Sequence, residues 1–334
     1  AVGHNALTTN TTAGQNTAVG QESLKANTTG ALNTAVGAEA LKANTTASNN
    51  VAIGVNSMLT ATTAENNTAV GMNSLNLHTT GDGNVAVGYK ALEASTTAGN
   101  NVAIGQQALL LTTTGQNNVA VGALALDANT TAGDNAAIGY AALGGNTTGA
   151  SNVAIGHSAL LVNSTGANNV AIGTQALKAN TTAGQNVAIG FGAGDSVTGS
   201  SSHNTFTGLY AGAYNTPTTT GARNIMYGAY AHASGGTVND AHGFGYDINC
   251  ASGYTTLGNA GDDIRAAHGN VTWATVSDER YKKDIVDSTA GLSFVNALQP
   301  RTFKYKNLGE LPSAFNSYTA DSTDVFKNSD TNHG

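Results

Sequence analysis

A 17-residue pattern recurs eleven times between residues 1 and 187, without insertion or deletion. In every copy, unit position 1 is Ala, position 2 is Val or Ile, position 3 is Gly, position 12 is Thr and position 16 is Asn. Position 7 is Leu in ten copies and Met58 in the other. A unit this short cannot bury its own apolar side. Stacked copies must therefore share one core, which is the signature of a solenoid.

The invariant residues predict short strands joined by tight corners. The alternation Asn-x-Ala-Val/Ile-Gly is typical of a strand, and we expect the β-branched side chain at position 2 to point into the core. Gly at position 3 permits a positive φ or a close backbone approach. Ala or Ser at position 6 and Leu at position 7 predict a second inward-facing segment, and the following Asn-Thr-Thr has turn chemistry. Asn at position 16 suits a ladder of stacked amides.

These features predict an all-β fold, a parallel β-roll or β-solenoid, because Gly, Thr and Asn are poor helix formers. Each coil offers little apolar area against an ordering cost of about 1–2 kcal/mol per residue. We therefore expect three parallel chains to share a core as a homotrimeric fibre. A monomeric β-solenoid is the alternative.

Composition excludes several classes of function. Charged residues make up 10% of the chain, against about 25% in ordinary globular proteins. No block of like charges indicates nucleic-acid binding, and no apolar run is long enough to cross a membrane. Cys250 is the single cysteine, so an intrachain disulfide framework is excluded. Without a phosphate-binding loop or metal-ligand spacing, we expect no cofactor and no metal.

Aromatic residues are concentrated beyond the strict repeats. Residues 1–190 contain two, whereas residues 191–276 contain ten. Tyrosines on Gly-rich loops supply rigid contact area. The candidate receptor-binding residues are Tyr210, Tyr214, Tyr227, Tyr230 and Tyr246. We favour the alternative that these rings fill a wider trimer core, because aromatic rings dominate core energetics.

The repeated stretch Asn-Val-Ala-Ile-Gly-x-x-Ala-Leu resembles the head repeats of trimeric autotransporter adhesins and the fibre repeats of phage tail proteins. In those families such repeats form parallel β-rolls, and three chains associate into a stalk or head. The resemblance therefore implies a homotrimer.

A charged block follows the aromatic region. Six of the twelve residues of ATVSDERYKKDI, at 274–285, are charged. Further on, Leu292, Val295 and Leu298 recur at helical spacing, Pro300 ends that segment, and residues 301–306 alternate like a strand. A small α+β segment is therefore predicted after the β region.

The stretches SDERYKKDI and AGLSFVNALQPRTFKYK together resemble the start of the intramolecular chaperone of endosialidase-type phage tail spikes. The matching residues are Ser277, Asp278, Arg280, Lys282, Pro300, Phe303, Tyr305 and Lys306. The resemblance implies trimerisation followed by self-cleavage at Val276–Ser277, with Ser277 as nucleophile and Lys282 as base. The alternative is a charged segment that assists folding without cutting.

We thus expect a repeat shaft at 1–190, an irregular aromatic-rich β region at 191–272, and the start of a chaperone at 273–334, in a protein that extends beyond both ends of this chain. The predicted function is that of a trimeric phage tail fibre on the extracellular virion. Its partners would be its own copies, a host cell-surface glycan or protein, and other tail proteins. Any activity would be a single self-cleavage, with no external substrate. The alternatives are a bacterial cell-surface trimeric adhesin and an ice-binding solenoid built on the Thr pairs.

Overall fold

The computed structural model describes residues 1–199, 201–215, 217–269 and 274–275. The chain divides into two units, Ala1–Ser277 and Asp278–Gly334, and all described residues belong to the first. These residues form strands and turns and contain no helix. Among them, therefore, no helix is long and apolar enough to cross a membrane.

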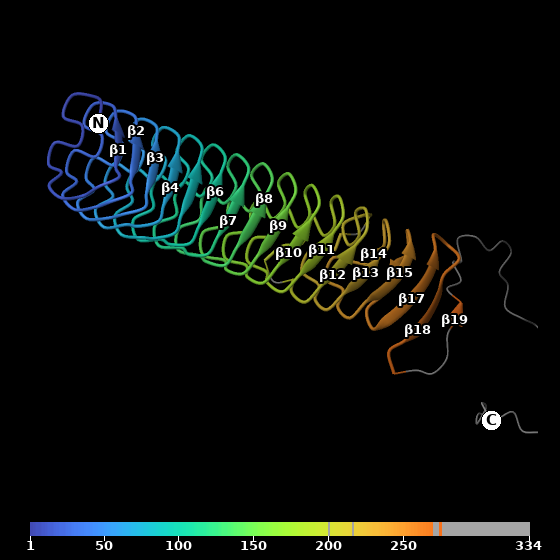
Figure 1. Ribbon diagram of the computed structural model, residues 1–334. Helices are drawn as coiled ribbons and strands as arrows, with labels where there is room; N and C mark the ends of the chain where they lie inside the picture. The colour runs from blue at the N-terminus through green and yellow to red at the C-terminus, as the bar shows by residue number, and fades with distance from the viewer. Residues whose placement is uncertain (200, 216, 270–273, 276–334) are drawn as a thin grey trace, which may run out of the picture. The chain divides into compact units, whose positions relative to one another are not determined.

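Each coil contributes one short strand, and the strands lie side by side along the axis of the first unit (Figure 1). The strands of the strict repeats are β1 Thr17–Val19, β2 Thr34–Val36, β3 Val51–Ile53, β4 Thr68–Val70, β5 Val85–Val87, β6 Val102–Ile104, β7 Val119–Val121, β8 Ala136–Ile138, β9 Val153–Ile155, β10 Val170–Ile172 and β11 Val187–Ile189. The later strands are β12 Thr205–Thr207, β13 Ile225–Tyr227, β14 His232–Ala233, β15 His242–Tyr246, β16 Asn249–Cys250, β17 Tyr254–Asn259, β18 Ile264–Ala267 and β19 Ala274–Thr275.

Parallel pairing in strict register confirms the predicted β-solenoid. Within the repeats each residue pairs with the residue 17 positions later, as Ala18 does with Ala35. Beyond β11 the pairing continues with altered coil lengths, from Ala188 to Phe206, to Met226 and to Gly243. β14 and β16 pair separately as a two-stranded parallel ladder. The antiparallel strands β18 and β19 follow β17 at the end of the sheet.

The expectation that the β-branched residue at position 2 points inward is wrong. The middle residue of each strand in the strict repeats, Ala, is buried, whereas the position 2 side chains point outward, with Ile138 and Ile53 42% and 40% exposed. Alternation along a strand separates the two faces but does not say which face is the inner one. Here the predicted inward segment at positions 6 and 7 does form, and Leu at position 7 fills the coil so that only Ala fits opposite.

Each coil turns through residues in the left-handed backbone region, including the buried leucines. Leu41 has φ 49° and Leu177 has φ 49°, and the same holds for Met58 at φ 51°. This conformation costs a non-glycine residue about 1–2 kcal/mol, whereas burying a leucine side chain contributes about 1.5–3 kcal/mol. Burial of the leucine thus offsets the strain of the turn that positions it.

Gly at position 3 has both predicted features, a positive φ and a close approach to the backbone of the next coil. At Gly105, for example, φ is 138°, and a Cβ would collide with the carbonyl of Gly122 in the next coil. The coils therefore stack closely only because this corner carries no side chain.

Buried asparagines form the predicted ladder at position 16. The backbone N–H of Asn169 donates to Oδ1 of Asn152 at 2.9 Å, and Asn169 Nδ2 donates to the carbonyl of Ala183 at 2.9 Å. A second, interrupted ladder runs through position 10, where Asn163 Nδ2 donates to Asn146 Oδ1 at 2.9 Å. These amides satisfy turn carbonyls that would otherwise be buried without partners.

Candidate receptor-binding surface

The five candidate tyrosines divide between two faces of the solenoid. Tyr227 is the last residue of β13 and pairs with Phe244 of β15, so both continue the file of position 2 residues on the outer face of the sheet. Their rings lie 6.4 Å apart, and Tyr227 is 59% exposed. This pair extends the Val/Ile file rather than filling the interior of the coil.

The other four tyrosines form one cluster, which we call the tyrosine platform: Tyr210, Tyr214, Tyr230 and Tyr246. Ring centroids of Tyr210 and Tyr230 lie 6.3 Å apart with an interplanar angle of 17°. Tyr230 also lies 4.6 Å from Tyr214 and 5.7 Å from Tyr246. The platform joins residues from successive coils, so the sequence placed its members in one region without indicating that they touch.

Backbone geometry positions the central rings. The N–H groups of Tyr210 and Tyr230 donate to the carbonyls of Phe191 and Leu209 in the preceding coils, at 2.9 and 2.8 Å. These are the bonds that position 5 makes in the strict repeats. Gly192 occupies the same position one coil earlier, and a Cβ there would lie 2.5 Å from Cε1 of Tyr210. The missing side chain at residue 192 leaves room for the Tyr210 ring.

Polar groups border one end of the platform. Asp247 follows Tyr246 directly and takes the position 5 place in its coil, with its N–H donating to the carbonyl of Ala229 at 2.9 Å. The Asp247 carboxylate lies 3.9 Å from Nδ1 of His232, which hydrogen-bonds the carbonyl of Tyr230 at 2.9 Å. Sequence reasoning did not predict that Asp247 and His232 lie together, because these two residues meet only through coil stacking.

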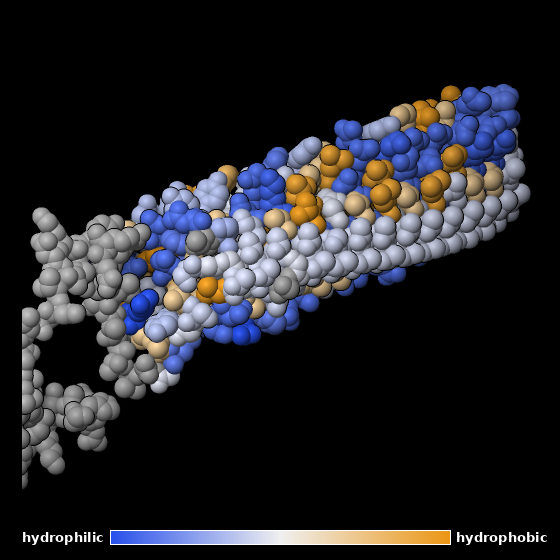
Figure 2. Space-filling view, turned by 180° about the vertical axis from the view of Figure 1, so that it is seen from behind, coloured by the Kyte–Doolittle hydropathy of each residue, from blue (hydrophilic) through white to orange (hydrophobic). Residues whose placement is uncertain are grey.

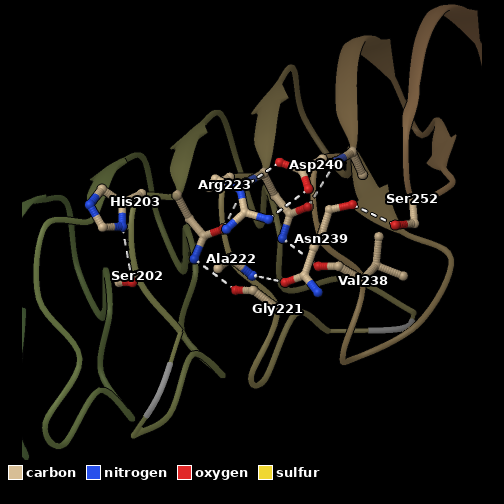
Figure 3. A network of polar contacts seen from close by, with 12 residues as sticks. Ser202, His203, Gly221, Ala222, Arg223, Val238, Asn239, Asp240 and Ser252 are labelled. Carbon is tan, nitrogen blue, oxygen red and sulfur yellow. Dashed lines mark hydrogen bonds and ion pairs between the residues drawn. The ribbon is translucent and has the colours of Figure 1, made fainter. Parts of the chain in front are cut away.

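A different polar network lies at the opposite ends of the same strands (Figure 3). The Arg223 guanidinium binds Asp240 of the next coil through two hydrogen bonds of 2.6 and 2.8 Å. Beside it, the Ala222 N–H donates to Oδ1 of Asn239 at 2.7 Å. Arg223 holds the pKa of Asp240 below its usual value. The network links successive coils, and its charges are already paired.

The Thr pairs form two files with different roles. In the first ten repeats the first residue of the pair bonds the next coil, as when Thr28 Oγ1 donates to the carbonyl of Thr45 at 3.0 Å. The second is exposed in all eleven repeats, from Thr12 to Thr182. A band of intermediate hydropathy runs along the coils on the side shown in Figure 2. These threonines lie in bends rather than strands, and one of the two hydroxyl files is used for stacking.

A shallow groove near the N-terminal end has an apolar floor of Ala26, Ala43 and Leu59. Its lysines are already paired, because Lys25 and Lys42 each lie 2.8 Å from the Glu22 carboxylate. These ion pairs lower the pKa of Glu22 to about 2. The groove therefore offers no unpaired cation to a ligand.

The described part of the chain contains no group of three or more His, Cys, Asp or Glu side chains able to hold a metal ion. The rings of His242 and His268 do lie close together, with centroids 4.6 Å apart and an interplanar angle of 40°. His268 Nε2 lies 3.2 Å from the hydroxyl of Thr255.

The residues assigned to cleavage and chaperoning lie outside the described residues. They are Val276, Ser277, Asp278, Arg280, Lys282, Pro300 and Phe303. Comparison with known families is informative for this segment. Residues 277–320 match the family described as chaperone of endosialidase. We call them the chaperone segment. No curated protein and no solved structure matches the chain.

The chaperone segment begins at Ser277, the residue at which the sequence resemblance starts. Together, the parallel solenoid of 17-residue repeats and this segment fit a tail-spike-like protein with a C-terminal chaperone. The match covers a minority of the chain and does not include the solenoid.

Proposed function

We propose that the protein is a homotrimeric phage tail fibre or spike that attaches the virion to its host and is assembled by the chaperone segment. The observation that carries the proposal is the order of the two parts: an in-register β-solenoid followed by a match to the chaperone of endosialidase from residue 277. An autotransporter adhesin would share the solenoid but not the chaperone segment.

The outer face of the sheet supports trimer formation. Strand positions 17 and 2 both point outward and carry Val, Ile or Thr in most coils. Ile104, Ile138 and Ile189 are 40–42% exposed in the single chain. A continuous apolar file of this kind marks an interaction surface. In a parallel trimer, identical positions of three chains would meet at the same height, because all coils share one register.

Self-cleavage would complete assembly. In the proposed reaction, the Ser277 hydroxyl attacks the carbonyl carbon of Val276 and Lys282 accepts the hydroxyl proton. Lys282 then gives this proton to the Ser277 nitrogen as the bond between that nitrogen and the Val276 carbonyl carbon breaks. Water then hydrolyses the resulting ester and frees the chain ending at Val276. A lysine can act as base here only if its pKa is lowered by burial or by neighbouring cations.

The test combines mass and cleavage of the full chain. Native mass measurement should give three times the chain mass of 33.3 kDa, or three times the mass of the chain ending at Val276. Ser277→Ala should remain full length while wild type shortens. A monomer would refute the fibre assignment, and equal chain lengths would refute the cleavage step alone. Attachment is tested by binding of the labelled protein to a panel of bacterial cells.

The row of exposed threonines supports ice binding as a second candidate function. An ice-binding solenoid would show thermal hysteresis as a purified protein, whereas a tail fibre would not. Replacing exposed threonines such as Thr131 with Lys would abolish that hysteresis.

A further inference from the structure

We infer that the tyrosine platform is a binding site for the apolar face of a neutral sugar in a host-surface glycan. The inference rests on the proposed attachment function and specifies its ligand class. Two rings are open to solvent at the edges of the platform, with Tyr214 40% and Tyr246 52% exposed. Tyr230 is half-buried and contacts both of these rings, and the half-buried Tyr210 stacks on Tyr230.

The rings suit a pyranose more than a flexible peptide. A tyrosine ring carries negative charge density on its face, and the C–H groups on one face of a pyranose carry partial positive charge. Tyrosine also has few rotatable bonds, so little conformational entropy is lost when a ligand stacks on it. Tyr230 stacks on Tyr210 and contacts Tyr214 at an interplanar angle of 54°, and these contacts restrict the rings further.

Polar groups beside the rings complete a sugar site. The Asp247 carboxylate borders the platform and is 35% exposed, so it can accept hydrogen bonds from sugar hydroxyls. His232 lies on the inner side of this carboxylate and packs edge-on against Tyr214, with ring centroids 6.3 Å apart. An apolar surface with a few convergent polar groups is the general composition of a small-ligand site.

Local charge decides between neutral and acidic glycans. Residues 191–269 contain five aspartates and two cationic side chains, Arg223 and Arg265. Arg223 is bound to Asp240 at the other ends of the strands, and Arg265 lies over the ring of Tyr254. A sialic or uronic acid would meet Asp247 without a compensating cation, so the site favours uncharged hexoses.

A tyrosine in the strict repeats provides a matched control. Tyr140 follows the corner residue Gly139 as Tyr246 follows Gly245, and both tyrosines are 52% exposed. Among the described residues, Tyr140 has a ring contact with His157 alone, at 5.3 Å, and it lies within the strict repeats. A loss of binding that depends on the platform should therefore appear in Tyr246→Ala and not in Tyr140→Ala.

The experiment is affinity electrophoresis of the full chain in native gels containing mannan, dextran or galactan, with polygalacturonate as the acidic probe. At least one neutral polysaccharide should retard the wild type, and polygalacturonate should not. Tyr246→Ala and Tyr214→Ala should weaken retardation at least tenfold, and Asp247→Asn several-fold. Tyr140→Ala should match the wild type.

Three results would overturn the inference: no retardation by any neutral polysaccharide, retardation by polygalacturonate alone, or platform variants that bind like wild type. A fall in native mass for Tyr246→Ala would also overturn it, because the platform would then be a contact between chains. Cell binding separates the two proposals. If the wild type binds cells and Tyr246→Ala binds them equally well, only the sugar site is refuted. If the wild type binds no cells, the attachment function is refuted.

Discussion

Phe206 fills space that is left open by Gly212. Phe206 stands in register with Ala188 and is fully buried, in a position that carries Ala in every strict repeat. Gly212 makes the backbone hydrogen bond that Leu makes in the repeats, and a Cβ on it would collide with the Phe206 ring. Gly194, one coil earlier, is also in Leu position, and its Cβ would lie 2.7 Å from Cδ2 of Phe206. One large ring thus replaces two leucine side chains where the coil length changes.

Phe206→Ala should therefore leave a cavity between two glycines. The expected loss is about 3–5 kcal/mol in the free energy of unfolding, the range for large-to-small changes at buried aromatic positions. Urea unfolding measures it. The double variant Phe206→Ala/Gly212→Leu restores the residues of a standard coil and should recover much of this loss. Leucine is compatible with the site because Leu177 has φ 49° in its own coil and Gly212 has φ 73°. A double variant less stable than Phe206→Ala would contradict the volume compensation.

Gly105→Ala should be among the most damaging single changes in the shaft. Its φ of 138° is a conformation that alanine avoids, and the added Cβ would meet the Gly122 carbonyl. We expect a loss of more than about 4 kcal/mol or no folded protein. Gly14→Ala is the control, because among the described residues no atom beyond Gly14 and its chain neighbours lies within 4 Å of its Cβ position. Thermal unfolding of the two variants should differ widely, and similar melting temperatures would refute close stacking at the corner.

His78 makes stability depend on pH. The ring is buried in place of a ladder Asn, with Nδ1 3.1 Å from the Ser95 hydroxyl and Nε2 bonded to the Gly81 carbonyl. Burial lowers the His78 pKa below its ordinary 6.5. The unfolded chain therefore binds the proton first, so the stabilising effect of the neutral ring is complete above pH 6.5 and is lost as the pH falls toward the lowered pKa. His78→Asn, which restores the residue of neighbouring ladders, should remove this part of the pH dependence. Identical profiles for both proteins would exclude His78 as its source.

Cys250 should be chemically silent in the folded protein. Its sulfur occupies the place where a Cβ on Gly243 would lie, which explains why this coil lacks the usual Ala. Burial raises the pKa of the thiol to about 12, so almost no thiolate exists at neutral pH. A thiol reagent at pH 8 should react only after unfolding in urea, and the native protein should lose stability as the pH rises from 9.0 toward 12. Rapid labelling of the native protein would contradict the packing of β15 against Cys250.

Ile138→Asp tests the outer sheet face. The side chain is 42% exposed in one chain, so an isolated coil should tolerate the charge. In the proposed trimer, three carboxylates would approach one another in an apolar interface, and the native mass should fall to that of a monomer. Thr131→Asp, on an exposed bend, is the matched control and should remain trimeric. A trimer in both variants would place the interface elsewhere.

The amino-acid sequence by itself determined the period, the parallel register, the glycine corner and the amide ladder at position 16. The physical reason is repetition: in a stack of equal coils, each unit position meets only its own copies, so Asn152 must lie beside Asn135 and Gly105 beside Gly122. The residue type at a unit position therefore also specifies which residue type it contacts in the next coil.

Only the tertiary structure decided which strand face is inside. A three-residue strand with Ala between two β-branched residues is consistent with either direction, and the leucine that fills the coil reaches it through a left-handed turn that propensity disfavours. The sequence likewise does not determine which face each tyrosine occupies. Tyr227 and Tyr230 are three residues apart, yet one extends the outer sheet face and the other joins Tyr210 and Tyr246. Their neighbours come from other coils of unequal length, and no local pattern encodes those contacts.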